Sequence, residues 1–482
     1  MNRNILIIVV LLLFNFGYGQ NNWTGAASTD WEDNSNWSSG HTPLATESVI
    51  ISNVPNQPVI SVAGAVCSQI VMSNSTPGST VSLTVTGAGI FTVGAITMDD
   101  TGNDSVICSL KIGTGTVNVS GSVFMNGSAN RNNISFTGAG TLNIGFSIYG
   151  GALSAGTGLV NYNSTTQQQN IASFTYYNLT ISGSTSKLVN TAGVIVNGVF
   201  SMEGTATVSA APTYGSAAAL EYYTTTPRTA GPEWVTPFTA TRGVIISNTG
   251  AITTDSNKAM SDNVPLTINN GATLLTGTDI GTGFNYNLYF RGDFINNGIL
   301  ISYGDVFIEG TASIQSIGGF TIEGGAGVHM RKTIGTATLK NNIAAGFLRI
   351  NGIGGTLNLG TGLTHTFTET LGWIRTNGTL DGGSSLLKIG GDISGSGGSF
   401  IAGTGTVEFN GVNQNLGTGA ITYNNLTFSG SGVKTISPGT VTVNGTLSIE
   451  GDSIMSISTA PIYGATATLQ YNSAVAHTVG AE

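Results

Sequence analysis

Apolar and polar residues alternate along short stretches of this chain, and a glycine pair precedes many of these stretches. Four segments share the pattern: GTGTVNV from Gly113, GAGTLNI from Gly138, GTGLVNY from Gly156 and GTGTVEF from Gly403. Alternation with a period of two predicts a strand with one buried face, and the glycines predict a tight turn before it. Apart from the N-terminus, apolar residues show no sustained helical spacing. The pattern therefore predicts an all-β protein.

These strand units belong to longer internal repeats. GGALSAGTGLVNYN from Gly150 matches GGSFIAGTGTVEFN from Gly397, at a shift of 397 − 150 = 247 residues. Residues 214–233 then align without gaps with residues 463–482, at a shift of 463 − 214 = 249 residues. The first copy continues with Trp234, whereas the second stops before that position. We therefore expect the sequence to be a fragment of a longer repeat protein.

Two architectures satisfy short strands, tight turns and stacked similar units. In a parallel β-helix, or β-solenoid, each strand pairs with the equivalent strand about twenty residues later, and the spacing of 18 residues from Gly138 to Gly156 fits such a rung. A string of tandem antiparallel β-sandwiches is the alternative. Low charge favours the solenoid, because interior rungs cover their edges with neighbouring rungs and need few charged residues there.

The N-terminus carries a secretory signal. Residues 1–19 combine Arg3, an apolar run over residues 5–16 and small residues before a cleavage site after Gly19. The run is too short to cross a bilayer, so we expect an exported, extracellular and surface-associated chain without a transmembrane segment after cleavage. The remaining predicted regions are an N-terminal Trp-rich cap (20–52), a β-repeat region (53–149), repeat copy 1 (150–238), a central β-repeat region (239–396) and repeat copy 2 (397–482).

Composition narrows the function classes. Only 8% of the 482 residues are charged, compared with about 25% in an average soluble domain. The net charge of −9 comes from 24 acidic and 15 basic residues, and the largest basic cluster is the triplet His329, Arg331 and Lys332. Such a surface has too few clustered basic residues to bind a phosphate backbone, so the sequence excludes a nucleic-acid partner.

Candidate binding residues are few. Trp23, Trp31 and Trp37 could stack on sugar rings of a glycan, or they could pack as a cap over the first rung of a solenoid. The acidic loop MDDTGND offers Asp99, Asp100 and Asp104 as oxygen ligands for calcium, and the sequence suggests no other cofactor. A solvated turn is the alternative interpretation of that loop, because it lacks the spacing of a calcium-binding EF-hand.

Cys67 and Cys108 either form one disulfide, which an oxidising compartment permits, or remain as buried thiols. The four histidines stand in unrelated contexts and give no zinc-binding spacing. The glycine pairs do not form a dinucleotide-binding loop, because the place of its third glycine is taken by Asn118, Asn143, Asn161 or Glu408. No catalytic serine elbow is present, and the sequence predicts a protein that is not an enzyme.

Three blocks of sequence carry a resemblance to a known family. They are the opening W-T-G … D-W … N-W … P, the block G-T-G-T-V-x-F-N … Y-N-N-L-T-x-S-G … V-N-G-x-L-S, and the block Y-G … L-x-Y … T-x-G-x-E-W. The chain resembles the large, adhesin-like β-strand-repeat surface proteins of Gram-negative bacteria that the type IX secretion system exports. The resemblance implies a C-terminal sorting domain, which this sequence lacks.

We therefore expect an exported cell-surface β-repeat protein that acts as a structural scaffold or adhesin through weak, multivalent contacts. Its partners would be surface glycans or other cell-surface proteins. The alternative is a polysaccharide-binding or polysaccharide-degrading β-helix protein, which would need clustered carboxylates for the degrading reaction.

Overall fold

Strand is the dominant secondary structure of the chain in a computed structural model that describes residues 19–100, 106–126, 131–277 and 285–482. Strands make up 49% of it and helix 1%, and the stacked strands form a β-solenoid of about 18 turns. Paired strands of the described residues run parallel, as β8 (Thr116–Val119) does with β11 (Thr141–Ile144) and β30 (Leu288–Phe290) does with β33 (Val306–Ile308). This arrangement confirms the predicted solenoid and rules out the tandem antiparallel sandwiches.

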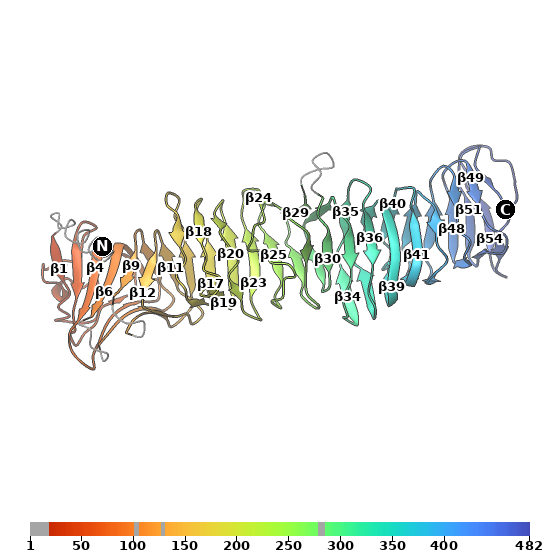
Figure 1. Cartoon of the computed structure of the whole chain (residues 1–482). Helices are drawn as coiled ribbons and strands as arrows, with labels where there is room; N and C mark the ends of the chain where they lie inside the picture. The colour runs from red at the N-terminus through yellow and green to blue at the C-terminus, as the bar shows by residue number, and fades with distance from the viewer. Residues whose placement is uncertain (1–18, 101–105, 127–130, 278–284) are drawn as a thin grey trace, which may run out of the picture. The chain divides into compact units, whose positions relative to one another are not determined.

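The chain divides into two compact units, residues 1–218 and 219–482. In unit 1 the strands stack rung upon rung along three sides (Figure 1). The first side holds β4 (Ala63–Asn74), β6 (Ile90–Asp100), β8 (Thr116–Val119), β11 (Thr141–Ile144), β14 (Leu159–Tyr162), β17 (Asn178–Ile181) and β20 (Val199–Glu203). The second holds β1 (Gln20–Asn22), β2 (Ser48–Ile51), the far halves of β4 and β6, β9 (Val123–Met125) and β12 (Ile148–Gly150). The third holds β3 (Val59–Ile60), β5 (Thr80–Val85), β7 (Ile107–Ile112), β10 (Asn132–Phe136) and β13 (Ala152–Ser154).

Shorter strands close the later turns of unit 1. They form two small sheets: β15 (Gln169–Asn170), β18 (Ser186–Leu188) and β21 (Thr207–Val208), and then β16 (Thr175–Tyr176), β19 (Ile195–Val196) and β22 (Thr213–Tyr214). One short 3-10 helix, η1 (Asn34–Asn36), lies in the N-terminal segment.

Unit 2 repeats this plan. One side holds β23 (Ala219–Tyr223), β25 (Val244–Ser247), β28 (Leu266–Ile268), β31 (Phe294–Asn296), β34 (Ile314–Ile317), β37 (Thr336–Leu339), β39 (Phe347–Asn358), β41 (Trp373–Asp381) and β44 (Ser399–Ile401). Another holds β27 (Lys258–Ala259), β30 (Leu288–Phe290), β33 (Val306–Ile308), β36 (Gly327–Met330), the first halves of β39 and β41, and β43 (Ile393–Ser394).

The third side of unit 2 is one continuous sheet. It holds β24 (Arg228–Thr229), β26 (Ala251–Thr253), β29 (Thr273–Thr276), β32 (Ile299–Ser302), β35 (Phe320–Ile322), β38 (Ile343–Ala345), β40 (Thr364–Phe367), β42 (Leu386–Ile389), β45 (Thr406–Phe409), β48 (Asn425–Phe428), β51 (Thr446–Ile449) and β54 (Thr468–Tyr471). Two small sheets accompany the last turns: β46 (Gln414–Asn415), β49 (Val433–Thr435) and β52 (Ser456–Ile457), and β47 (Ile421–Tyr423), β50 (Val441–Val443) and β53 (Ile462–Tyr463).

The alternating pattern accounts for the core. On β8, Val117 and Val119 are buried, while Thr116 and Asn118, which alternate with them, are half-buried on the outer face. Leu142 and Ile144 of β11 stack on these two valines in register. Each fully buried aliphatic side chain contributes about 1.5–3 kcal/mol relative to exposure, so the inward column stabilises every rung. The strands predicted from the glycine-pair segments are therefore confirmed.

The second glycine of a glycine pair lets neighbouring rungs approach closely, as Gly140 shows. A Cβ on Gly140 would lie 2.7 Å from the carbonyl oxygens of both Gly113 and Gly115, which belong to the preceding rung. A real Cβ does not come this close to backbone oxygen, so only glycine fits.

The two repeat copies fold alike. Strands β14, β17 and β18 of the first copy have their counterparts 247 residues later in β45, β48 and β49. The burial pattern is the same in both members of the first pair, with the second and fourth residues of β14 and β45 buried. The sequence repeat is therefore also a structural repeat of whole rungs.

A buried glutamine braces one corner of each copy. Gln169 donates through Nε2 to the carbonyl oxygens of Ile144 and Phe146, at 2.8 and 2.7 Å, and its Oε1 accepts from the amide of Ser164 at 2.9 Å. Gln414 makes the matching contacts with Ile389, Gly391 and Gly411, at 2.8, 2.8 and 2.9 Å. These bonds hold the corner backbone of adjacent rungs together, and they add a second bond to the carbonyl groups of Ile144 and Ile389, which also accept from the amides of Asn163 and Asn410.

Candidate functional site

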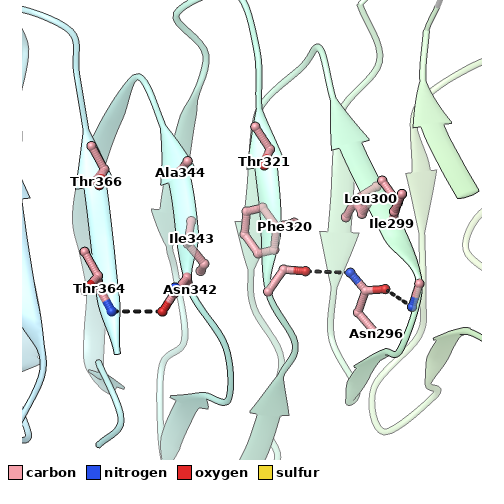
Figure 2. Close-up of a pocket in the computed structure, with 12 residues that line it drawn as sticks. Asn296, Ile299, Leu300, Phe320, Thr321, Asn342, Ile343, Ala344, Thr364 and Thr366 are labelled. Atoms are coloured by element: carbon pink, nitrogen blue, oxygen red, sulfur yellow. Dashed lines mark hydrogen bonds between the residues drawn. The ribbon is translucent and has the colours of Figure 1, made fainter. Parts of the chain in front are cut away.

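An open hollow lies on the outer face of the continuous sheet in unit 2. It has a volume of about 400 Å³ and crosses the adjacent strands β32, β35, β38 and β40. Figure 2 shows Thr321, Ala344 and Thr366 following one another across three of these strands, in agreement with their pairing in register. A second hollow of about 860 Å³ adjoins the first and shares Asn296, Gly298, Gly319 and Asn342 with it. Together they form a groove, which we call the unit 2 groove.

The groove exists because small residues occupy its floor and edge. Ala344 takes an outward position where the neighbouring strands carry threonine. Gly298 and Gly319 add no side chain, and a Cβ at either place would lie 2.3 or 2.5 Å from a carbonyl oxygen of another rung. Close packing of the backbone therefore requires glycine at these two positions, and the groove lies where their side chains are missing.

Amide groups on the rim of the groove are held in fixed positions. Asn296 donates through Nδ2 to the carbonyl oxygen of Gly319 at 2.6 Å, and its Oδ1 accepts from the amide of Gly298 at 3.0 Å (Figure 2). Asn342 accepts through Oδ1 from the amide of Thr364 at 2.9 Å. These amides keep further hydrogen-bonding capacity for a ligand, since Asn342 is exposed and Asn296 and the lining threonines are half-buried.

The described lining of the unit 2 groove consists of amides, hydroxyls, glycines and apolar side chains, of which Ile299 is 54% exposed. Such a surface can form hydrogen bonds with hydroxyl groups and cover apolar ring faces. Pairs of carboxylates, which acid–base cleavage of a glycosidic bond uses, do not occur in this lining. The groove is suited to binding an uncharged polar polymer.

Unit 1 has a comparable hollow of about 410 Å³, whose lining includes Thr92, Asn118 and Asn143. Beside it an asparagine ladder runs along the outer face of β8, β11 and β14. Asn161 Nδ2 donates to Asn143 Oδ1 at 3.0 Å, and Asn143 Nδ2 donates to Asn118 Oδ1 at 2.8 Å. These are the residues that exclude a dinucleotide-binding loop, and their stacked amides give this hollow the same polar character as the unit 2 groove.

The three N-terminal tryptophans lie in the core. Trp23, Trp31 and Trp37 are 3%, 1% and 3% exposed. Trp31 and Trp37 meet edge to face with centroids 4.6 Å apart, and Trp31 also contacts Phe91 at 5.5 Å. The ring faces are therefore covered by one another, and a sugar would reach them only if this cluster opened. The geometry supports the capping hypothesis and gives no support to glycan stacking.

The structure does not support a metal site at the calcium candidates. Asp104 and the side chain of Asp100 fall outside the described residues. Of the three proposed calcium ligands, only Asp99 on β6 can therefore be placed. Nowhere in the described chain do three or more His, Cys, Asp or Glu side chains lie close enough to hold a metal ion.

The cysteines lie on different sides of unit 1. Cys67 is on β4 and Cys108 is on β7 of another sheet, and both are buried and not joined to each other. Burial raises the pKa of the Cys67 thiol far above its usual range, which makes it unreactive. Of the two outcomes that the sequence left open, the structure shows the buried thiols.

Sequence reasoning missed the unit 2 groove, the hollow in unit 1 and the buried corner residues Gln169 and Gln414. The groove depends on which residues of strands some twenty residues apart lie side by side, and no single segment displays that register. The asparagine ladder did leave a signal, because Asn118, Asn143 and Asn161 occupy the same place in three successive glycine-pair units.

Comparisons with protein-family models, curated proteins and solved structures find no match to this chain. Among the residues that the structure describes, no helix is long and apolar enough to cross a membrane.

Proposed function

We propose that this chain is an exported surface protein that acts as a scaffold or adhesin, binding neutral glycans through weak contacts that are repeated along its outer faces. The observation that carries the proposal is the recurrence of one kind of hollow. The hollows in unit 1 and unit 2 are both open, both rich in asparagine and threonine, and similar in size at about 410 and 400 Å³.

Each contact of this kind is weak on its own. A hydrogen bond between neutral groups contributes only about 0.5–1.5 kcal/mol in water, because it replaces bonds to solvent. Several such contacts made by one polymer are effective together, since each binding event raises the local concentration for the next. Rigid strands also hold the amides in place, which limits the entropy lost on binding.

The test compares soluble oligosaccharides with the same sugars as immobilised polymers, using the chain from residue 20 to residue 482. We expect measurable retention on at least one neutral polysaccharide and an apparent affinity at least about a hundredfold lower for its short oligosaccharides. Ala344→Tyr should fill the unit 2 groove and weaken retention, because Ala344 lies exposed on its floor. Thr376→Tyr, which places the same ring at an exposed position on β41, is the matched control.

Three results would overturn the proposal. One is the absence of binding to every neutral polymer. Another is equal retention by the Ala344→Tyr variant and the wild type. The third is the release of reducing or unsaturated sugars during incubation, with or without calcium, which would show an enzyme instead of a scaffold.

A further inference from the structure

A row of aromatic and cationic side chains runs along the outer face of another side of unit 2. Tyr289, Phe307, His329 and Arg349 occupy equivalent outward positions on β30, β33, β36 and β39, paired in register. Phe307 stacks on Tyr289 and on His329, with centroids 4.6 Å apart in both cases. We call these four residues the cationic row, because it ends in a guanidinium group.

Arginines border the row. The guanidinium carbon of Arg331 lies 4.0 Å from the centre of the Phe307 ring, and Arg331 pairs with Glu309 at 3.6 Å. Glu309 also pairs with Arg291 at 3.1 Å, so one carboxylate serves two guanidinium groups. The Arg331 side chain remains 42% exposed. Part of its charge therefore faces solvent beside the stacked rings.

Arg349 has no anionic partner among the described residues. It is half-buried, and its side chain makes no hydrogen bond or ion pair with them, while its Nε is buried without an acceptor. On the strand before it, His329 is 6% exposed, and its Nδ1 is likewise buried without a hydrogen-bond partner. A half-buried guanidinium without a partner is costly in free energy, and an anion placed against it would recover part of that cost.

The balance of charge at this face is unusual for the chain. Arg291, Arg331 and Arg349 stand against two carboxylates, Asp305 and Glu309, although the whole chain has a net charge of −9. Asp305 is engaged with His329 at 3.3 Å and accepts from the amide of Gly327. Neither carboxylate pairs with Arg349, so the local excess of positive charge lies at that end of the row.

We propose that the cationic row and the bordering Arg331 form a binding site for an acidic polysaccharide, with Arg349 and Arg331 taking the carboxylate of a sugar acid. Guanidinium groups form paired, charge-assisted hydrogen bonds with carboxylates. The Phe307 ring packs against the guanidinium group of Arg331 and helps to hold it in position. This site lies on a different side of unit 2 from the groove, and it stands whether or not the groove binds a neutral glycan.

The test measures binding of the chain from residue 20 to residue 482 to immobilised polygalacturonate, dextran sulfate and dextran. Arg349→Gln removes the unpaired charge, and Arg242→Gln removes one exposed charge elsewhere in unit 2, so that both variants have the same net charge. We expect Arg349→Gln to lose roughly tenfold in affinity for polygalacturonate, the usual effect of one charge-assisted hydrogen bond. Arg242→Gln should bind as the wild type does. Binding should also weaken with salt, as the Debye length falls from about 30 Å at 0.01 M to about 3 Å at 1 M.

A stability measurement separates a binding role from a structural one. Since Arg349 has no partner within the described chain and its burial is costly, Arg349→Gln should leave the melting temperature unchanged or raise it. The proposal is wrong if the wild type does not bind polygalacturonate, if both variants lose affinity equally, or if Arg349→Gln loses binding only together with thermal stability. A loss confined to dextran sulfate would overturn the assignment to a carboxylate and identify a sulfate site instead.

Discussion

Lys187 and Lys434 lie 247 residues apart and make the same contact in the two repeat copies. Lys187 Nζ donates to the carbonyl oxygen of Ser164 at 3.0 Å, and Lys434 Nζ donates to that of Gly411, the matching residue, at 2.6 Å. Both lysines are fully buried. Burial lowers the pKa of each ammonium group to about 8, because the charged form loses its hydration. The repeat therefore preserves a costly buried cation together with the carbonyl that receives it.

Gln414 is predicted to be essential to its corner. Gln414→Leu would remove the donor to two carbonyl groups, the acceptor for the amide of Gly411 and a 2.7 Å contact with Lys434. Each buried group left without a partner costs about 1–3 kcal/mol, so we expect a loss of roughly 3–5 kcal/mol in the free energy of unfolding. Gln470→Leu, an exposed position on β54, should change it by less than about 0.5 kcal/mol. Urea unfolding of both variants measures the difference, and equal stabilities would contradict the bracing role.

Stability should depend on pH in two opposite ways. The pKa values of Lys187 and Lys434 are lower in the folded chain than in the unfolded one, so the unfolded state binds more protons between about pH 8 and 10.5 and stability rises with pH there. Burial raises the pKa of Tyr162 to about 12, so above about pH 10 the unfolded state loses protons that the folded state keeps, and stability falls. The two lysines still outweigh the tyrosine at pH 10, so melting temperatures measured from pH 7 to 12 should pass through a maximum near pH 10 to 11.

A double substitution tests the rise in stability that we assign to Lys187 and Lys434. Replacing Lys187 and Lys434 together by methionine should flatten the rise below pH 9 and leave the fall above pH 10. A wild-type profile that is level from pH 7 to 9.5 would show that the ammonium groups do not titrate in this range.

Much of the fold follows from local sequence. The alternation at Val117 and Val119 predicts an inward column, and the structure stacks these residues under Leu142 and Ile144. Parallel pairing was the correct choice over antiparallel sandwiches. The burial of the N-terminal tryptophans was one of two open interpretations, because an indole ring suits a core as well as a sugar.

Polar residues were harder to interpret, for a physical reason. Gln169 and Lys187 look like surface residues in a strand-and-turn sequence, yet both are fully buried. Their partners are carbonyl groups on other turns, such as those of Ile144 and Ser164, and backbone groups leave no mark in the sequence. The same holds for the unit 2 groove, where the absence of side chain at Gly319 matters only because Asn342 lies on the next rung.

The asparagine ladder is predicted to be sensitive to charge. In Asn143→Asp the carboxylate would still accept from Asn161 but could not donate to Asn118 Oδ1, so two oxygens would face each other. We expect a loss of about 1–2 kcal/mol at pH 7 relative to the wild type, with part of it recovered below about pH 4, where the carboxyl group is protonated and donates. Asn133→Asp is the control, since Asn133 Oδ1 only accepts from Ser109. Equal effects of the two changes at pH 7 would argue against a ladder.

The tryptophans provide a test of the core in solution. None of the five is more than 3% exposed, including Trp234 and Trp373. Iodide should therefore quench their fluorescence several-fold less in the folded chain than in guanidinium. Strong quenching in the folded chain would show that the N-terminal cluster opens, and it would return Trp23, Trp31 and Trp37 to the list of sugar-stacking candidates.

The repeat of whole rungs also bears on how such a chain changes in evolution. The second and fourth residues are buried in β11 and in β42, and the same pattern recurs in the strands that follow them, β14 and β45. A copied block of complete turns therefore packs, at each of its two ends, against a strand with the same pattern of buried and outward residues. Genetic duplication or deletion of a block of complete turns alters the length of the coil while every remaining strand keeps its inward and outward faces.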